Sequence, residues 1–196
     1  MTFDTLLAGP VMAVLRGLPP EETVRIARTA WQLGVAAVEV PIGRPEQVPA
    51  LAAAVAAGRA EGRGVGAGTV LTVEQVAAAR VAGAVFTVSP GFDPDVLRAS
   101  LAADMPHLPG VATPTELHRA VAAGCGWVKV FPASALGPSW FRDIRGPFPD
   151  VRLVATGGIT AATAADFLRA GADVVGVGSA LSDPTQLPSL VALLRT

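Results

Sequence analysis

The chain has 196 residues, a net charge of −1 and only 16% charged residues, so neither nucleic acid nor an anionic membrane is expected as a partner. Its one cysteine, Cys125, excludes an intrachain disulfide, and its two histidines form no metal-ligand cluster. No apolar stretch approaches the roughly 20 residues of a membrane helix, and no signal peptide is recognisable. We expect one cytoplasmic domain, residues 1–196, without a metal.

Short apolar runs alternate with longer helical patterns. The predicted strands are 11–15, 36–40, 63–67, 85–88, 107–111, 127–131, 152–155 and 174–177. Eight strand-helix units without a linker favour a closed α/β barrel, the (β/α)8 or TIM barrel, over an open doubly wound sheet. The chain is short for that fold, so its loops must be short. Residues 2–9 are expected to form a short helix that closes the bottom of the barrel.

Helix boundaries are marked by capping residues. Thr72 with Gln75 and Thr113 with Glu116 have capping-box spacing. Asp93-Pro94 and Asp183-Pro184 place a side-chain acceptor before a proline suited to the first helical turn. Five glycines follow alanine-rich helical patterns and suit the left-handed position after a helix. They are Gly34, Gly58, Gly83, Gly124 and Gly171.

The chain has one lysine, Lys129, beside fourteen arginines, and it lies in the predicted strand 127–131. Alternation along that strand places Trp127, Lys129 and Phe131 on one face and two valines on the other. The valines suit the helix-facing side of a barrel, so Lys129 is expected inside. Burial disfavours an ammonium ion, and a neutral amine can form a Schiff base with a carbonyl substrate. The alternative is a lysine that extends from a strand end to solvent.

The expected partner of Lys129 is Glu39, in the predicted strand 36–40. Alternation puts Glu39 on the same face as Ala37 and Pro41, so its carboxylate also points into the barrel. There it can pair with the lysine and transfer protons during the carbinolamine and enamine steps. A purely structural ion pair is the alternative.

Two glycine-rich turns follow the last two strands: TGGIT at 156–160 and GVGSAL at 176–181. In a (β/α)8 barrel a phosphate commonly binds between these loops, held by backbone N–H groups. Glycine lets the backbone come close to such a ligand. The residues that fit this role are Gly157, Gly158, Gly178 and Ser179. Tight turns without a ligand are the alternative.

Other polar residues lie near strand ends. Arg16 after the first strand and Thr69 after the third lie at the end of the barrel where substrates bind, and together they suit a substrate carboxylate. His107, at a strand start, and His118, on a helix, are expected to be structural. Cys125 precedes the lysine strand and is expected to pack rather than react.

Seven segments now form a recognisable set. They are VEVPI (38–42), GAGTVL (66–71), SPG (89–91), PGVATPTE (109–116), VKVFPAS (128–134), TGGIT (156–160) and GVGSAL (176–181). In this order the chain resembles the 2-keto-3-deoxy-6-phosphogluconate aldolase family. These class I aldolases also include 2-keto-3-deoxy-6-phosphogalactonate and 4-hydroxy-2-oxoglutarate aldolases.

The resemblance implies a homotrimer of (β/α)8 barrels in which Lys129 forms the Schiff base and Glu39 moves protons. It implies cleavage of a 2-keto-3-deoxy-6-phospho sugar acid to pyruvate and glyceraldehyde 3-phosphate, without metal or organic cofactor. Other residues would bind the substrate: Thr69 and an arginine its carboxylate, Pro90 and Phe131 the pocket wall, and Gly157, Gly158 and Ser179 its phosphate.

The arginine is a point of departure. Gluconate-type members carry it four residues after the glutamate, where this chain has Gly43, followed by Arg44. Arg16 resembles the galactonate-type pattern instead, whereas Thr156 matches the gluconate-type residue before the double glycine. The sequence leaves open which arginine binds the carboxylate and which C4 epimer is preferred. A 4-hydroxy-2-oxoglutarate aldolase, a phosphate-binding barrel isomerase without imine chemistry and a non-catalytic sugar-phosphate binding protein remain alternatives.

Overall fold

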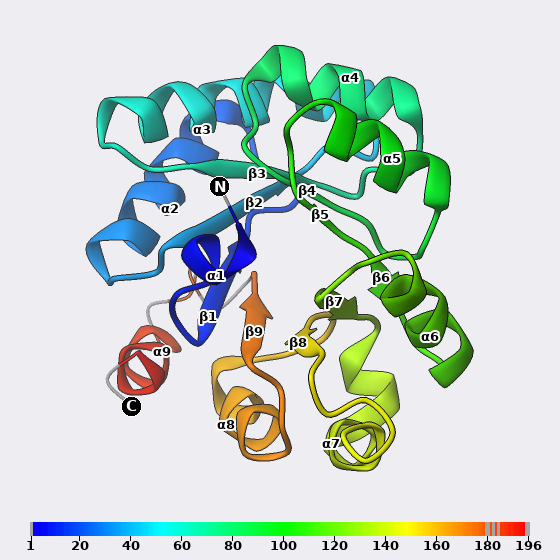
Figure 1. The fold of residues 1–196 in the computed structure, drawn as a ribbon. Coiled ribbons are helices and arrows are strands. Elements are labelled where there is room, and N and C mark those ends of the chain that lie inside the picture. Colours follow the sequence, from blue (N-terminus) through cyan, green and yellow to red (C-terminus); the bar gives the residue numbers. More distant parts are fainter. Residues whose placement is uncertain (1, 179–180, 182, 184, 195–196) are drawn as a thin grey trace.

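The computed structural model describes residues 2–178, 181, 183 and 185–194. Figure 1 shows strands gathered at the centre and helices around them, which confirms the predicted α/β barrel. The strands are β1 (Val11–Val14), β2 (Ala37–Pro41), β3 (Val65–Gly68), β4 (Thr87–Val88), β5 (His107–Leu108), β6 (Gly110–Val111), β7 (Trp127–Val130), β8 (Arg152–Ala155) and β9 (Val174–Val177). All pairs are parallel, in the order β5-β4-β3-β2-β1-β9-β8-β7-β6.

The predicted fifth strand, 107–111, is in fact two strands on either side of Pro109. Proline has no N–H to donate to a ladder, so a strand that contains it is interrupted there. β5 pairs with β4 and β6 pairs with β7, which brings both ends of the sheet to this one segment. The N–H of Lys129 donates to the carbonyl of Pro109 over 2.8 Å. The ring of strands therefore closes beside the lysine.

The helices surround this ring. They are α1 (Phe3–Leu6), α2 (Pro20–Gln32), α3 (Val48–Ala60), α4 (Val73–Ala82), α5 (Pro94–Ala102), α6 (Pro114–Ala122), α7 (Ala133–Ile144), α8 (Ala161–Arg169) and α9 (Leu187–Leu193), and a 3-10 turn, η1 (Pro45–Gln47), precedes α3. Among the described residues, no helix has the length and hydropathy of a membrane span.

Most predicted helix starts are confirmed. Both capping boxes form: the Thr72 hydroxyl accepts from the N–H of Gln75, and the Thr113 hydroxyl accepts from that of Glu116. Asp93 caps α5 as expected. The start predicted at Asp183-Pro184 is wrong, because α9 begins at Leu187 and Asp183 accepts from the N–H of Thr185 in a turn. Residue 184 lies outside the described part of the chain.

Four of the five marker glycines do follow a helix in a left-handed conformation. Gly34, Gly83, Gly124 and Gly171 have φ of 94°, 85°, 88° and 110°. The prediction for Gly58 is wrong, since it lies inside α3. A Cβ there would come 2.7 Å from the carbonyl oxygen of Arg63, so glycine is required for close packing at this point. The left-handed turn after α3 falls at Gly62, with φ 67°.

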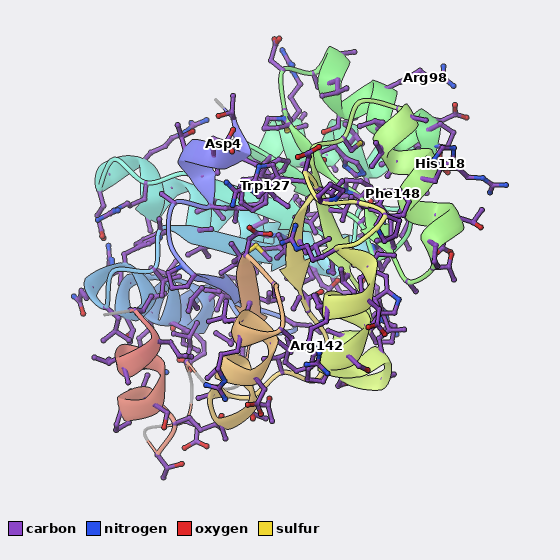
Figure 2. All side chains as sticks on the ribbon, turned by 60° about the horizontal axis from the view of Figure 1, so that its bottom comes forward. Asp4, Arg98, His118, Trp127, Arg142 and Phe148 are labelled. Carbon is purple, nitrogen blue, oxygen red and sulfur yellow. The ribbon has the colours of Figure 1, made fainter. Side chains whose placement is uncertain are left out.

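The strands have two apolar faces. Valines such as Val38 and Val128 pack outward under the helices in the larger core cluster. The inward face forms a second cluster, in which Phe86 meets Phe3 of α1 edge-to-face at 5.9 Å. The Trp127 Nε1–H donates to Asp4 over 3.2 Å, and Figure 2 shows these two side chains close together. The prediction that a short helix within residues 2–9 closes the bottom of the barrel is therefore confirmed. The polar candidate residues lie at the other end.

Candidate active site

Lys129 lies inside the barrel, as the alternation of its strand predicted. Its side chain is 2% exposed, whereas Val128 and Val130 on either side pack outward against the helices. Its Nζ lies 5.2 Å from the ring centroid of Phe131, on the same face of the chain. Burial of an ammonium ion costs several kcal/mol unless the charge is compensated. Lys129 at this position therefore requires either a negatively charged neighbour or a substrate with which its amine reacts.

Glu39 lies across the barrel interior, where its charge interacts with that of Lys129, but the two form no ion pair in the described part of the chain. It is fully buried on β2, and neither carboxylate oxygen has a hydrogen-bond partner among the described residues. Burial raises the pKa of Glu39, while the charges of Lys129 and then Arg16 lower it in part. A raised pKa makes the protonated form of a carboxyl more accessible, as a group that both donates and accepts a proton requires.

A cavity of about 310 Å³ opens above the lysine. It is formed at the carboxyl ends of β1, β7, β8 and β9, which is where (β/α)8 barrels bind substrates. Its lining residues are Val14, Arg16, Lys129, Phe131, Thr156, Gly157, Gly158, Ile159, Thr160, Gly176 and Gly178. Seven of the residues singled out in the sequence are thus brought together around one space.

The structure distinguishes between the two candidate arginines. Arg16 lines the cavity, and its charge acts on Glu39. Arg44 lines a separate pocket between the ends of β1 and β2, and its guanidinium lies 4.0 Å from Glu46. Arg16 is therefore the cation that faces the reacting groups.

The TGGIT turn presents backbone donors to the cavity. The N–H groups of Ala133 and Ser134 donate to the carbonyls of Thr156 and Gly157, over 2.7 and 3.0 Å. In a trans peptide the C=O and the following N–H point in opposite directions. The N–H groups of Gly157 and Gly158 are therefore held away from α7, and they have no acceptor among the described residues. These two free donors suit an anionic group.

Three predicted site residues of the described chain, Glu39, Thr69 and Pro90, are not among those that line the cavity. Thr69 is half-buried with φ 55°, a strained conformation for a β-branched residue, and Pro90 packs against Gly110. Ser179 lies outside the described residues. Four lining residues were not selected from the sequence: Ile159 and Thr160 of the TGGIT turn, Gly176 of the GVGSAL turn, and Val14, which lies two positions before Arg16 and so shares its face. The Thr156 hydroxyl is buried and unpartnered within the described chain.

His107, His118 and Cys125, for which no chemistry was expected, do not line the cavity. His107 lies in a buried chain of hydrogen bonds. Its Nδ1–H donates to the Thr87 hydroxyl, the Thr87 hydroxyl donates to that of Ser100, and Ser100 donates to the carbonyl of Met105. His118 projects from the outer surface in Figure 2, and Cys125 is half-buried. Within the described residues, no group of three or more His, Cys, Asp and Glu could hold a metal ion.

Comparison with known proteins agrees with this geometry. The family model for KDPG and KHG aldolases matches residues 4–189. The chain belongs to this family. Its aldolase relatives include a probable 2-dehydro-3-deoxy-6-phosphogalactonate aldolase of Rhizobium meliloti (strain 1021), 40% identical over 89% of this chain and 82% of the relative. A 2-dehydro-3-deoxy-phosphogluconate aldolase of Treponema pallidum (strain Nichols) is 40% identical over 94% of this chain and 87% of its own length.

The structure of an aldolase of the same family supports the comparison. KDPG aldolase from Legionella pneumophila, with pyruvate captured at low pH as a covalent carbinolamine intermediate, has a TM-score of 0.81. It is 30% identical and the match covers 95% of this chain and 93% of that one. A carbinolamine is the adduct that precedes a Schiff base, so that family member forms a covalent bond to pyruvate.

Proposed function

We propose that this lyase is a class I aldolase that cleaves a 2-keto-3-deoxy-6-phospho sugar acid, of the gluconate or galactonate type, to pyruvate and glyceraldehyde 3-phosphate. The observation that carries the proposal is the placement of the chain's one lysine. Lys129 is buried at the cavity, electrostatically coupled to the buried Glu39, and Arg16 lines the same space.

The first half of the reaction builds an electron sink. Neutral Lys129 adds to the C2 ketone, and protonated Glu39 donates its proton to the carbinolamine hydroxyl, which leaves as water. The product is a protonated imine on Lys129 and a carboxylate on Glu39. That carboxylate then takes the proton of the C4 hydroxyl, directly or through a water.

The second half divides the substrate. As the C4 oxygen loses its proton, the C3–C4 bond breaks, its electron pair moves into the imine, and glyceraldehyde 3-phosphate leaves. Glu39 returns its proton to C3 of the enamine, and hydrolysis of the imine frees pyruvate and restores the amine. Glu39 alternates between acid and base through these steps, for which its raised pKa is suited.

Substrate binding follows from the charges around the cavity. Arg16 would hold the C1 carboxylate, since a guanidinium forms strong paired hydrogen bonds with such a group. The N–H groups of Gly157 and Gly158, which have no acceptor among the described residues, would hold the 6-phosphate. Phe131 and Thr156 line the same cavity. The resemblance adds Thr69 to the carboxylate site, Pro90 to the wall and Ser179 to the phosphate site, and the glycine-rich loop that lines the cavity adds Gly178.

The experiment is borohydride reduction in the presence of pyruvate. We expect one reduced adduct per chain, located on Lys129 by peptide mass mapping, and no adduct on Lys129→Ala. A protein that gives no adduct yet interconverts sugar phosphates would be a barrel isomerase instead. Pyruvate release measured with each C4 epimer, and with 4-hydroxy-2-oxoglutarate, then identifies the preferred substrate.

We further propose that the protein is a homotrimer that acts in the cytoplasm. The trimer rests on the family resemblance and on apolar side chains exposed on the outer helices, among them Val81 of α4. The location rests on the substrates, because phosphorylated sugar acids are made and consumed inside cells.

A further inference from the structure

Gly68, the last residue of β3, lies directly under the carboxyl group of Glu39. A Cβ built on Gly68 would overlap the Glu39 Oε1 and would lie 2.5 Å from its Cδ and 2.7 Å from its Cγ. These three atoms of Glu39 are the nearest heavy atoms to that position. The space that a side chain would fill at residue 68 is therefore occupied by the end of Glu39.

The backbone does not explain a glycine at this position. Gly68 is not among the residues of positive φ, and it lies in a regular parallel strand, opposite Pro41 of β2. Glycine is otherwise unfavourable in a β-strand, because it loses more backbone entropy on folding than any other residue. Its one evident benefit here is the absent Cβ.

Hydrogen bonds do not fix the carboxyl either. Both oxygens of Glu39 are without a hydrogen-bond partner among the described residues. β2 and β7 are separated in the sheet by β1, β9 and β8, so Glu39 must reach Lys129 across the barrel interior. The charges of Lys129 and Arg16 act on the carboxyl without contacting it, so the shape of its surroundings determines where it rests.

We propose that Gly68 is a positioning residue for the proton-transfer group, because its missing side chain forms the hollow in which the Glu39 carboxyl rests. The inference rests on the proposed role of Glu39 as the acid and base of the aldolase reaction. A methyl group at residue 68 displaces the carboxyl from its place opposite Lys129. Displacement of a catalytic group by about 1 Å can cost about 10²-fold in rate.

The first test is Gly68→Ala, compared with Gly126→Ala as a matched control. Gly126 also has ordinary φ, directly precedes β7, and has nothing within 4 Å of an added Cβ. We expect Gly68→Ala to lower kcat by about 10²-fold with less than about a threefold change in KM, and Gly126→Ala to retain the wild-type rate. Wild-type kcat in Gly68→Ala would overturn the proposal.

A double mutant separates positioning from general damage. In a Glu39→Gln background the proton-transfer group is already lost, so adding Gly68→Ala should lower kcat by less than about threefold. If the two substitutions instead multiply their effects, Gly68 acts independently of Glu39 and the proposal is wrong. Two other proteins in the same series test the proposed function itself. Wild-type protein that forms no pyruvate adduct would reject that function rather than the role of Gly68. A Glu39→Gln variant with unimpaired kcat would do the same.

A stability measurement covers the case in which Gly68→Ala does not fold. Glu39→Ala removes all three atoms that the new methyl group would meet. Gly68→Ala should therefore lower the Tm of the wild-type protein, and the same substitution should leave the Tm of Glu39→Ala unchanged. An equal loss of Tm in both backgrounds would place the steric conflict elsewhere and overturn the proposal.

Discussion

Glu39 lies where its charged form is poorly solvated, and this makes the stability of the protein depend on its protonation. Burial raises its pKa in the folded chain. As pH rises above the ordinary carboxyl value of about 4.3, the unfolded chain loses the proton first, so folding stability is lost as pH rises through the folded pKa. Glu39→Gln has no proton to lose. We expect it to have a higher unfolding free energy than wild type in urea at pH 7, and the same one near pH 4.

The same variant should lose activity while it gains stability. If Glu39 is the acid and base, kcat of Glu39→Gln should fall by roughly 10²–10⁴, measured by pyruvate release coupled to lactate dehydrogenase. A structural ion pair with Lys129 would give the opposite pattern, because removal of one partner of a buried pair is destabilising. Lower stability with near-normal kcat would therefore assign Glu39 a structural role.

The burial of His107 should lower the unfolding free energy of the protein in acid. Burial lowers its pKa from 6.5 to about 4. The unfolded chain therefore takes up a proton first as pH falls through 6.5 towards 4, which destabilises the fold by about 3 kcal/mol over that range. In His107→Asn, where the amide can still donate to Thr87, the unfolding free energy should change less between pH 7 and pH 4. His118→Asn, on the exposed face of α6, is the control; equal slopes in both variants would contradict the assignment.

Among the elements, α1 has a role out of proportion to its four residues. Phe3 is buried at the bottom of the barrel against Phe86, where it fills the ring interior. Phe3→Ala should leave a cavity there and lower the unfolding free energy in urea by about 3 kcal/mol. Leu71→Ala, on a side chain that is 50% exposed, should change it by less than about 0.5 kcal/mol. Equal, small effects would mean that α1 does not support the barrel.

Helix α7 is interrupted by a bend at Gly137-Pro138. Gly137 has φ 76° and ψ 165°, a region that only glycine adopts readily, and Pro138 then begins the second segment. Gly137→Ala should therefore destabilise the protein by about 1–3 kcal/mol in urea unfolding. Gly146 follows the same helix and has an ordinary φ, and an added Cβ there would meet only the Asp143 carbonyl oxygen, at 3.6 Å. Gly146→Ala should therefore change the unfolding free energy very little. A neutral Gly137→Ala would show that the bend is not required.

The direction of a side chain can be predicted from the sequence in a strand but not in a loop, for a physical reason. Side chains alternate strictly along a strand, so the neighbouring valines sufficed to place Lys129 and Glu39 inside the barrel. Loops have no such period. Arg16 and Arg44 both follow strands, and only the folded chain shows that one faces the cavity and the other a neighbouring pocket.

Two glycines are explained by contacts that local sequence patterns do not reveal. Gly58 lies within α3, and a Cβ there would come 2.7 Å from the carbonyl oxygen of Arg63, which follows the helix. The hollow at Gly68 depends on a side chain from another strand, 29 positions earlier in the chain. Local patterns indicate which way a residue points, whereas the reason for a glycine can lie in a neighbour that only the fold brings near.

At the scale of the molecule, the two ends of the barrel have different compositions. The bottom is closed by apolar side chains of α1, and the opposite end carries Arg16, the lysine and the free N–H groups of the TGGIT turn. Residues that stabilise the fold and residues proposed to bind substrate thus lie at opposite ends of the barrel. Substitutions at Phe3 should change the unfolding free energy without changing kcat/KM, and substitutions at Arg16 should do the reverse.

The outer surface predicts self-association. Val73, Ala77 and Val81 lie at i, i+4 and i+8 on α4 and are exposed, Val81 by 90%, and Leu101 of the neighbouring α5 is 53% exposed. Exposed apolar groups of this kind commonly mark contacts between subunits. We expect multi-angle light scattering after size exclusion to give a mass three times that of the 19.8 kDa chain. The mass should persist on tenfold dilution, since the proposed trimer would bury these side chains; a mass of one chain throughout the dilution series would refute the trimer and leave these side chains in contact with solvent.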